Sequence, residues 1–250
     1  MTVVVVLANP PREGLVATGL AESTPLSTAE AAELYEAAFR DAVLAVDRSG
    51  GELLVNFPDE EAIPEPHRTA TAPEAELRAL VADTLGGTED ARFERQVGST
   101  FGARAGNTVT HLLREEDADS VAVVTPTAPL FSRTIVDSAA MKLRTSGVVI
   151  GPSTRGRAYY AGFTEPIDFA GAFDAPTLPT LAARGRDAGL DVEFVQSLPS
   201  LETRADLLDT VPLLRARFAA ERIVPEYTAA FVHEHGLDVV DDDGARIVRD

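Results

Sequence analysis

The sequence predicts an α/β fold, a three-layer sandwich with a mostly parallel central sheet, and two patterns carry this prediction. Short runs rich in β-branched residues alternate with longer segments of helical character along most of the chain. The first such run, residues 3–7, is continuously apolar, as is typical of a central parallel strand covered on both faces. A length of 250 residues and a hydrophobic fraction of 45% suffice for one sizeable domain with a full core.

The first half of the chain alternates between predicted strands and helices. Ser27 and Glu30 have the spacing of a capping box, which opens the first long helix. A stretch rich in proline and acidic residues, 58–72, is expected to form an exposed loop. The expected strands are 3–7, 52–57, 92–96 and 120–124, and the expected helices are 27–46, 74–85 and 102–114.

The second half continues the alternation and then changes character at Pro225. The pattern predicts helices at 132–144, 177–188 and from 203 onward, and strands at 147–150, 159–163 and 192–196. After Pro225 we expect a short helix to Gly236 and a small hairpin over 237–248, turning at 241–244. We therefore divide the chain into a main domain, 1–224, and a C-terminal appendage to the same domain, 225–250.

The charge of the chain is unusual. Forty acidic residues face 22 basic ones, the formal net charge is −18, and Lys142 is the only lysine. Crowded carboxylates of this kind stay hydrated in concentrated salt, where their mutual repulsion is screened. We therefore expect a halophilic, haloarchaeal source.

Composition also excludes several classes of function. The acidic surface repels a nucleic-acid backbone and an anionic membrane, so neither is expected as a partner. The absence of cysteine excludes disulfides and cysteine metal sites. Residues 1–7 are typical of a buried strand rather than a signal peptide, and no stretch approaches the roughly 18 apolar residues of a membrane span. We expect a cytoplasmic protein, and its oligomeric state is left open.

Ligands of a parallel α/β sheet bind beyond the carboxyl ends of the strands. This rule selects the loop 9–20 and the segments after Val124, Ile150 and Gln196 as candidate site regions. The chain contains neither a G-x-G-x-x-G motif nor a P-loop, which argues against a dinucleotide site and against a P-loop NTPase.

Five segments together resemble a known family. Residues 8–20 (ANPPREGLVATGL) are similar to the signature A-[RK]-x-P-x-x-G-x-V-K-T-R-L. The others follow in the same order: 96–104 resembles Q-x-x-x-x-L-G-x-R, 121–130 the strand ending in G-S-D-T-P-D-L, 151–163 G-P-A-E-D-G-G-Y-Y-L-I-G-L, and 200–207 D-V-D-T-P-E-D-L. The chain thus resembles a glycosyltransferase-like family of the nucleotide-diphospho-sugar transferase superfamily. The resemblance implies a GT-A-type sandwich that binds a nucleotide at the first loop.

The chain departs from this family at the charged positions. Ala17 and Gly19 stand where the family has the lysine and arginine that would neutralise a diphosphate. Pro126 stands where the family has an aspartate that would hold Mg²⁺ or Mn²⁺, and proline cannot supply an oxygen ligand from its side chain.

Two further acidic positions have changed. Thr154 and Arg155 replace the family's acidic pair, and Ser200 replaces the first aspartate of the D-V-D motif, where only Glu202 keeps a carboxylate. Mg²⁺ or Mn²⁺ remains a possible cofactor, but its usual ligands are mostly missing, because one carboxylate is a poor cage for a divalent ion.

Several interpretations stay open. In the first interpretation, the chain binds a nucleotide or nucleotide-sugar and its activity is metal-independent or lost. Arginines 12, 155 and 157 would then supply the positive charge. Alternatively, it is a non-catalytic scaffold or regulatory protein that retains only the fold. A third possibility is a metal-dependent transferase that uses Glu202 with Glu165 or Asp168. Convergence of Arg12, Arg155 and Glu202 on one pocket would favour the first interpretation, and their scatter over the surface would contradict it. Any activity in that first case would be glycosyl or nucleotidyl transfer.

The candidate site residues follow from these motifs. Glu202 is the remaining acid and Arg155 the replacement cation, which makes them the candidate catalytic pair. The residues expected to contact the ligand are Asn9, Pro10, Arg12 and Gly14 on the base and phosphate side, Thr125 and Thr127 at the former metal position, and Tyr159 beside Arg155 on the acceptor side.

Overall fold

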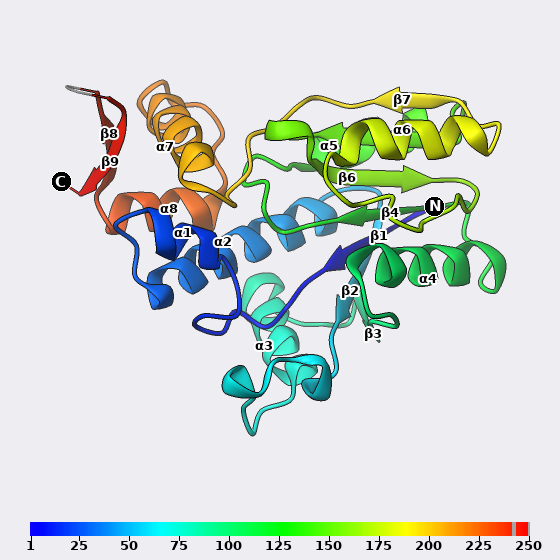
Figure 1. Cartoon of the computed structure of the whole chain (residues 1–250), viewed down its shortest axis with the longest axis horizontal. Helices are drawn as coiled ribbons and strands as arrows, with labels where there is room; N and C mark the ends of the chain where they lie inside the picture. The colour runs from blue at the N-terminus through cyan, green and yellow to red at the C-terminus, as the bar shows by residue number, and fades with distance from the viewer. Residues whose placement is uncertain (242–243, 250) are drawn as a thin grey trace.

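The computed structural model describes residues 1–241 and 244–249, and it is built on a seven-stranded sheet in the order β3-β2-β1-β4-β6-β5-β7. Figure 1 shows the sheet running through the middle of the molecule with helices packed against it. The strands are β1 (Thr2–Leu7), β2 (Glu52–Phe57), β3 (Ala91–Arg95), β4 (Ser120–Val124), β5 (Val148–Pro152), β6 (Ala158–Phe163) and β7 (Val192–Phe194).

All strands of this sheet are parallel except β6. Val4 of β1 is in register with Leu53 of β2 and Ala122 of β4, so the three neighbouring strands end at the same edge. β6 lies antiparallel between β4 and β5, and it therefore begins at the edge where they end. The predicted mostly parallel sheet is confirmed. We call the edge at which the parallel strands end the carboxyl edge.

The helices cover both faces of the sheet, as a three-layer sandwich requires. On one face α2 (Thr28–Asp47), α3 (Pro73–Leu85) and α5 (Arg133–Lys142) share a hydrophobic cluster with β1, β2 and β4. On the other face α4 (Phe101–Arg114) and α6 (Thr177–Asp187) form a second cluster with the same strands. The capping box at Ser27 and Glu30 is present, as predicted. Among the described residues, no helix combines the length and apolar character needed to cross a membrane.

A third hydrophobic cluster lies beyond the carboxyl edge, at the end of the molecule farthest from the amino ends of the strands (Figure 1). It joins the start of α2 to α1 (Thr18–Ser23), α7 (Arg204–Ala219), α8 (Glu226–Glu234) and the antiparallel hairpin of β8 (Leu237–Val240) and β9 (Arg246–Arg249). The small hairpin was predicted, although Asp242 and Asp243 of its turn lie outside the described residues. Helix α1 was not predicted, because its six residues show no capping signal.

Candidate functional site

Four separate segments meet at the carboxyl edge, near the ends of β4 and β5. The backbone N–H of Thr125, just after β4, donates to the carbonyl of Tyr159 over 3.2 Å. Two residues later, the carbonyl of Thr127 accepts a hydrogen bond of 2.8 Å from Leu201, in the loop after β7. A Cβ added at Gly19 would lie 3.1 Å from the carbonyl oxygen of Glu202, so the first loop also reaches this point. The segment after β5 also reaches it, through Arg157, so all four candidate regions gather around Glu202.

A guanidinium group occupies the centre of this arrangement. Arg157 Nη1 lies 2.7 Å from Glu202 Oε2, and Arg157 Nη2 lies 2.6 Å from Asp206 Oδ1. The same Nη2 donates to the hydroxyl of Thr154 at 2.6 Å. One arginine thus bridges the segment after β5 to two carboxylates of the segment around the start of α7.

The second oxygen of Glu202 faces a pair of hydroxyl groups. Thr127 Oγ1 donates to Glu202 Oε1 at 3.2 Å, and Thr125 Oγ1 lies 3.0 Å from Thr127 Oγ1. Glu202 is 39% exposed, which makes it the carboxylate of this network that solvent and a ligand can reach. The structure therefore brings together Thr125, Thr127 and Glu202, which the sequence assigned to one site.

Asp206 is the buried member of the network, with a side chain only 1% exposed. It also forms the capping box of α7, because it accepts from the backbone N–H of Thr203 at 2.8 Å while the Thr203 hydroxyl faces the N–H of Asp206. Burial opposes ionisation, but hydrogen bonds from Arg157, Thr154 and Thr203 outweigh burial and hold the pKa of Asp206 well below its usual range. Asp206 is therefore a permanent negative charge at neutral pH.

The residues at this site do not fit a divalent metal. Both carboxylates are engaged by the guanidinium of Arg157, and a cation there would meet a fixed positive charge at hydrogen-bond distance from both ligands. Over the described residues, no group of three potential metal-ligating side chains occurs.

The carboxylates considered for a metal-dependent transferase are also apart. Asp168 Oδ2 pairs with Arg184 of α6 at 2.9 Å, and Glu165 is exposed. Among the described residues, neither has a hydrogen bond or ion pair with Glu202, whose side chain is bound by Thr127 and Arg157.

Arg12 occupies a different centre from the one predicted. Its side chain is 8% exposed and is bound by Glu60 and Glu76 at 2.7 and 2.6 Å. It also donates to the carbonyls of His67 and Thr71. Each of its nitrogens is used, and the bond with Glu60 is the largest of the causes that raise the pKa of Arg12. The assignment of Arg12 to a ligand phosphate does not fit this structure, because no donor remains for it.

The rest of the first loop is shaped by the same contact with the loop 58–72. Gly14 has a φ of +72°, and a Cβ there would lie 2.9 Å from the ring of His67. Glycine is therefore required by the approach of His67, whether or not a ligand binds. Pro10 is buried, while Asn9 is exposed and its backbone N–H donates to the hydroxyl of Tyr35 at 3.0 Å. Of these three residues, only Asn9 presents its side chain to solvent.

Tyr159 and Arg155, assigned to the acceptor side, differ in exposure. The Tyr159 side chain is buried, and its hydroxyl donates to the carbonyl of Gln196 at 2.7 Å, so it fixes the loop after β7 rather than facing a ligand. Arg155 is exposed and has a φ of 57° within a short 3-10 turn. Among the described residues, its side chain has no hydrogen bond or ion pair. It is an available cation close in sequence to Arg157.

Arg12, Arg155 and Glu202 therefore do not converge on one pocket as a set. Arg12 has no partner in common with the other two, while Arg155 lies two residues from the arginine that binds Glu202. Arg157 was expected from the sequence to be a cation of the site, whereas its partner Asp206 was not predicted. The spacing of Thr203 and Asp206, which is that of a capping box, was the available signal.

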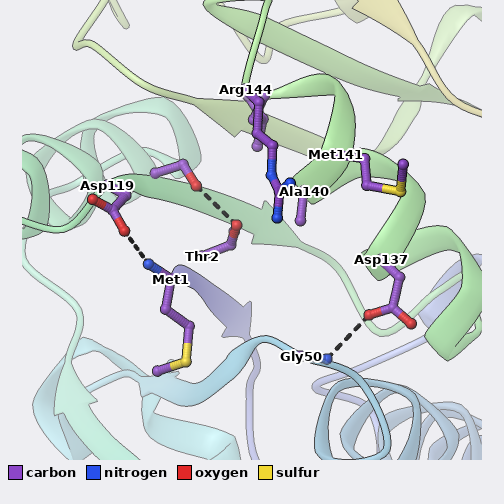
Figure 2. Close-up of a pocket in the computed structure, with 10 residues that line it drawn as sticks. Met1, Thr2, Gly50, Asp119, Asp137, Ala140, Met141 and Arg144 are labelled. Atoms are coloured by element: carbon purple, nitrogen blue, oxygen red, sulfur yellow. Dashed lines mark hydrogen bonds and ion pairs between the residues drawn. The ribbon is translucent and has the colours of Figure 1, made fainter.

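A pocket of about 580 Å³ lies at the opposite edge, at the amino ends of β1 and β4. Figure 2 shows Arg144 pointing into it, the amino group of Met1 paired with Asp119, and Asp137 bound to the backbone of Gly50. None of the predicted site residues lines this pocket.

Comparisons with known proteins concern the fold. No protein-family model and no curated protein sequence matches this chain. A solved structure from Desulfovibrio desulfuricans G20, provisionally named a nucleotide-diphospho-sugar transferase, is 21% identical, covers 94% of each chain and has a TM-score of 0.73. A cytidylyltransferase from Leptospira borgpetersenii is 8% identical over 93% of this chain and 92% of its own, with a TM-score of 0.51. The chain therefore has the fold of the nucleotide-diphospho-sugar transferases and nucleotidyltransferases.

Proposed function

We propose that this protein binds a nucleotide or nucleotide-sugar at the carboxyl edge, beside Glu202, without a divalent metal. The observation that carries the proposal is the guanidinium of Arg157, which lies between the carboxylates of Glu202 and Asp206. A metal-dependent transferase would need those oxygens for its cation. Here a residue of the chain supplies a fixed positive charge in the same place, and it cannot dissociate or deprotonate.

The groups around Arg157 suit a phosphorylated ligand. The hydroxyls of Thr125 and Thr127 can donate to phosphate oxygens, and Arg155 is an exposed cation next to the network. Both structural neighbours reported above are named for enzymes that act on nucleotides, which supports a ligand of this class. Glu202 is the acidic group available to a bound substrate, so any transfer of a glycosyl or nucleotidyl group would use it.

We also propose that the protein acts in the cytoplasm of a halophilic cell. The net charge of −18 is the reason, since such a surface needs concentrated salt for full stability. The same charge disfavours nucleic acids and anionic membranes as partners.

A second candidate function, a non-catalytic protein that keeps only the fold, is favoured by the charge balance. Arg12 and Arg157 are each paired with two carboxylates, so each centre has a net negative charge and would not attract a phosphate. On this view Arg155 is an ordinary exposed arginine.

Isothermal titration calorimetry in molar KCl distinguishes the two candidates. Nucleotides and nucleotide-sugars are titrated with and without Mn²⁺ against the wild type, Arg155→Gln and Arg186→Gln. Arg186 is an exposed arginine of α6 that pairs with Asp191, which makes it a matched control. We expect equal affinity with and without Mn²⁺, and a loss of about tenfold for Arg155→Gln only, the size of one charge-assisted hydrogen bond. Absence of binding by every ligand would favour the fold-only protein.

A further inference from the structure

The end of α7 and its connection to α8 expose an unusual amount of apolar surface. Leu213 is 37% exposed, Phe218 69% and Ile223 87%, and all three lie within eleven residues of sequence. Single exposed apolar residues are ordinary, but three large ones along one short segment indicate an interaction surface. This surface is separate from the site around Glu202.

A groove accompanies these side chains. Between α7 and α8 lies a hollow of about 720 Å³ whose floor includes Leu214, Val224 and Val232. Small residues, Ala219 and Ala230 among them, line it and permit close approach of another backbone. The ring of Phe218 lies 6.4 Å from that of His233 across the two helices and remains largely exposed. A second hollow, of about 610 Å³, adjoins the groove through Val224 and contains Ile223.

The charge of this surface differs from that of the chain as a whole. Residues 213–233 contain three arginines and two glutamates, whereas the chain has 40 acidic residues against 22 basic ones. Two copies of a protein with a net charge of −18 repel each other over most of their surfaces. The α7/α8 surface is a region where that repulsion is weak, and both signs of charge occur on it.

We propose that the α7/α8 surface, defined as residues 213–233, is the interface of a homodimer with two-fold symmetry. In an isologous contact each copy presents the same patch, so apolar residues that protrude need a groove beside them and arginines need glutamates on the same patch. Phe218 and Ile223 are the protruding apolar residues, and the groove lies beside them. Arg222 and Glu221 are the arginine and the glutamate that lie on the same patch. A strongly charged partner protein would be matched by a patch whose charges all have the opposite sign. This surface instead carries both arginines and glutamates.

Sedimentation equilibrium in molar KCl tests the proposal over a wide range of protein concentration. The wild type is compared with Phe218→Glu, Ile223→Glu and the control Met141→Glu, which places the same charge on a comparably exposed apolar residue of α5. We expect a dimer for the wild type and for Met141→Glu. Each of the other two variants should raise the dissociation constant at least about tenfold, because a carboxylate would be buried in an apolar contact.

Three outcomes would overturn the proposal. They are a wild type that remains monomeric throughout, a dimer that survives both substitutions, and a dimer weakened equally by Met141→Glu. Because all three substituted residues are exposed, circular dichroism should show that each variant keeps its fold. Nucleotide binding at Glu202 does not enter this test, so the two proposals fail separately.

Discussion

Arg12 and Arg157 are each held between two carboxylates from other elements, but water reaches the two centres to different degrees. Arg12 is almost fully buried, both of its carboxylates are mostly covered, and two backbone carbonyls complete its shell. Arg157 joins one fully buried carboxylate, Asp206, to one partly exposed carboxylate, Glu202, beside two hydroxyls. The first centre can only cross-link the chain, whereas the second presents a polar surface at the carboxyl edge.

This difference in exposure shows why the number of charged residues in a sequence does not predict which of them form a ligand-binding site. Both arginines were candidate phosphate ligands, and both carry one positive charge against two negative ones. Their geometry separates them: Arg12 joins the first loop to Glu60 and Glu76, while Arg157 binds Glu202, the carboxylate that the resemblance retains at its metal-binding motif. Substitutions at the two centres should therefore have different effects on stability.

Replacing Arg12 with alanine should have the largest effect on stability. The change leaves two carboxylates facing each other and two carbonyls without donors, and we expect a loss of about 4 kcal/mol in the free energy of unfolding. Chemical denaturation in molar KCl measures it. The control is Arg95→Ala, which removes an exposed arginine paired with Asp59 nearby. A loss as small as that of Arg95→Ala would show that the Arg12 centre does not cross-link the loops.

Arg157→Gln should cost somewhat less, about 3 kcal/mol, because Asp206 alone is left buried without a cation while Glu202 turns to water. Since the arginine lowers the pKa of Asp206, the variant should also bind a proton at higher pH than the wild type. The stability contributed by the ionised Asp206 is present above its unfolded pKa of about 3.9 and is lost below it. Unfolding curves of the wild type and the variant from acid to neutral pH measure both effects. Identical curves would contradict the assignment.

Asp41 is a buried carboxylate for which the structure describes no arginine partner. Its effect on the pH dependence of stability should be opposite in sign to that of Asp206. It accepts the backbone N–H groups of Tyr227 and Thr228 at the start of α8, and burial raises the pKa of Asp41 to about 6. Its contribution is therefore full below about pH 3.9 and is lost as the pH rises through 6, a change of about 2–3 kcal/mol. Asp41→Asn should flatten this part of the stability profile. If the free energy of unfolding of the variant changes with pH as steeply as that of the wild type, other groups cause the pH dependence.

Glu202→Gln should have the smallest effect on stability. The side chain is partly exposed and its pairing with Arg157 is open to solvent, so we expect a change within about 0.5 kcal/mol. The same variant should weaken nucleotide binding or abolish transfer if the proposed site is used. A large loss of stability would mean that Glu202 belongs to the scaffold, as Arg12 does.

Much of the fold could be predicted from the sequence because its signals are local. Continuous apolar runs such as residues 3–7 and the capping box at Ser27 mark strands and helix starts without reference to the rest of the chain. Helix α1 lacked such a signal. Pairs of residues far apart in the sequence could not be predicted in this way. No local pattern around Arg12 indicates that Glu60 and Glu76 lie beside it, so the loop 58–72 was expected to be simply an exposed loop.

The proximity of some candidate residues could be predicted for the same reason. Thr125, Thr127 and Glu202 follow strands that end at one edge, so strand assignment sufficed to bring them together. Tyr159 was misplaced because the sequence cannot show that its hydroxyl binds the carbonyl of Gln196. Arg155 was chosen over Arg157 by motif position, whereas which arginine reaches the carboxylates depends on the turn between them.

Electron paramagnetic resonance of Mn²⁺ in molar KCl shows whether Arg157 stands in place of a metal. The wild type is titrated beside Glu202→Gln, which removes one carboxylate of the pair but leaves the acidic surface otherwise unchanged. We expect the two proteins to show the same weak, non-stoichiometric binding of Mn²⁺. One tightly bound Mn²⁺ per wild-type chain, lost in Glu202→Gln, would mean that Glu202 holds a metal and that Arg157 does not replace it.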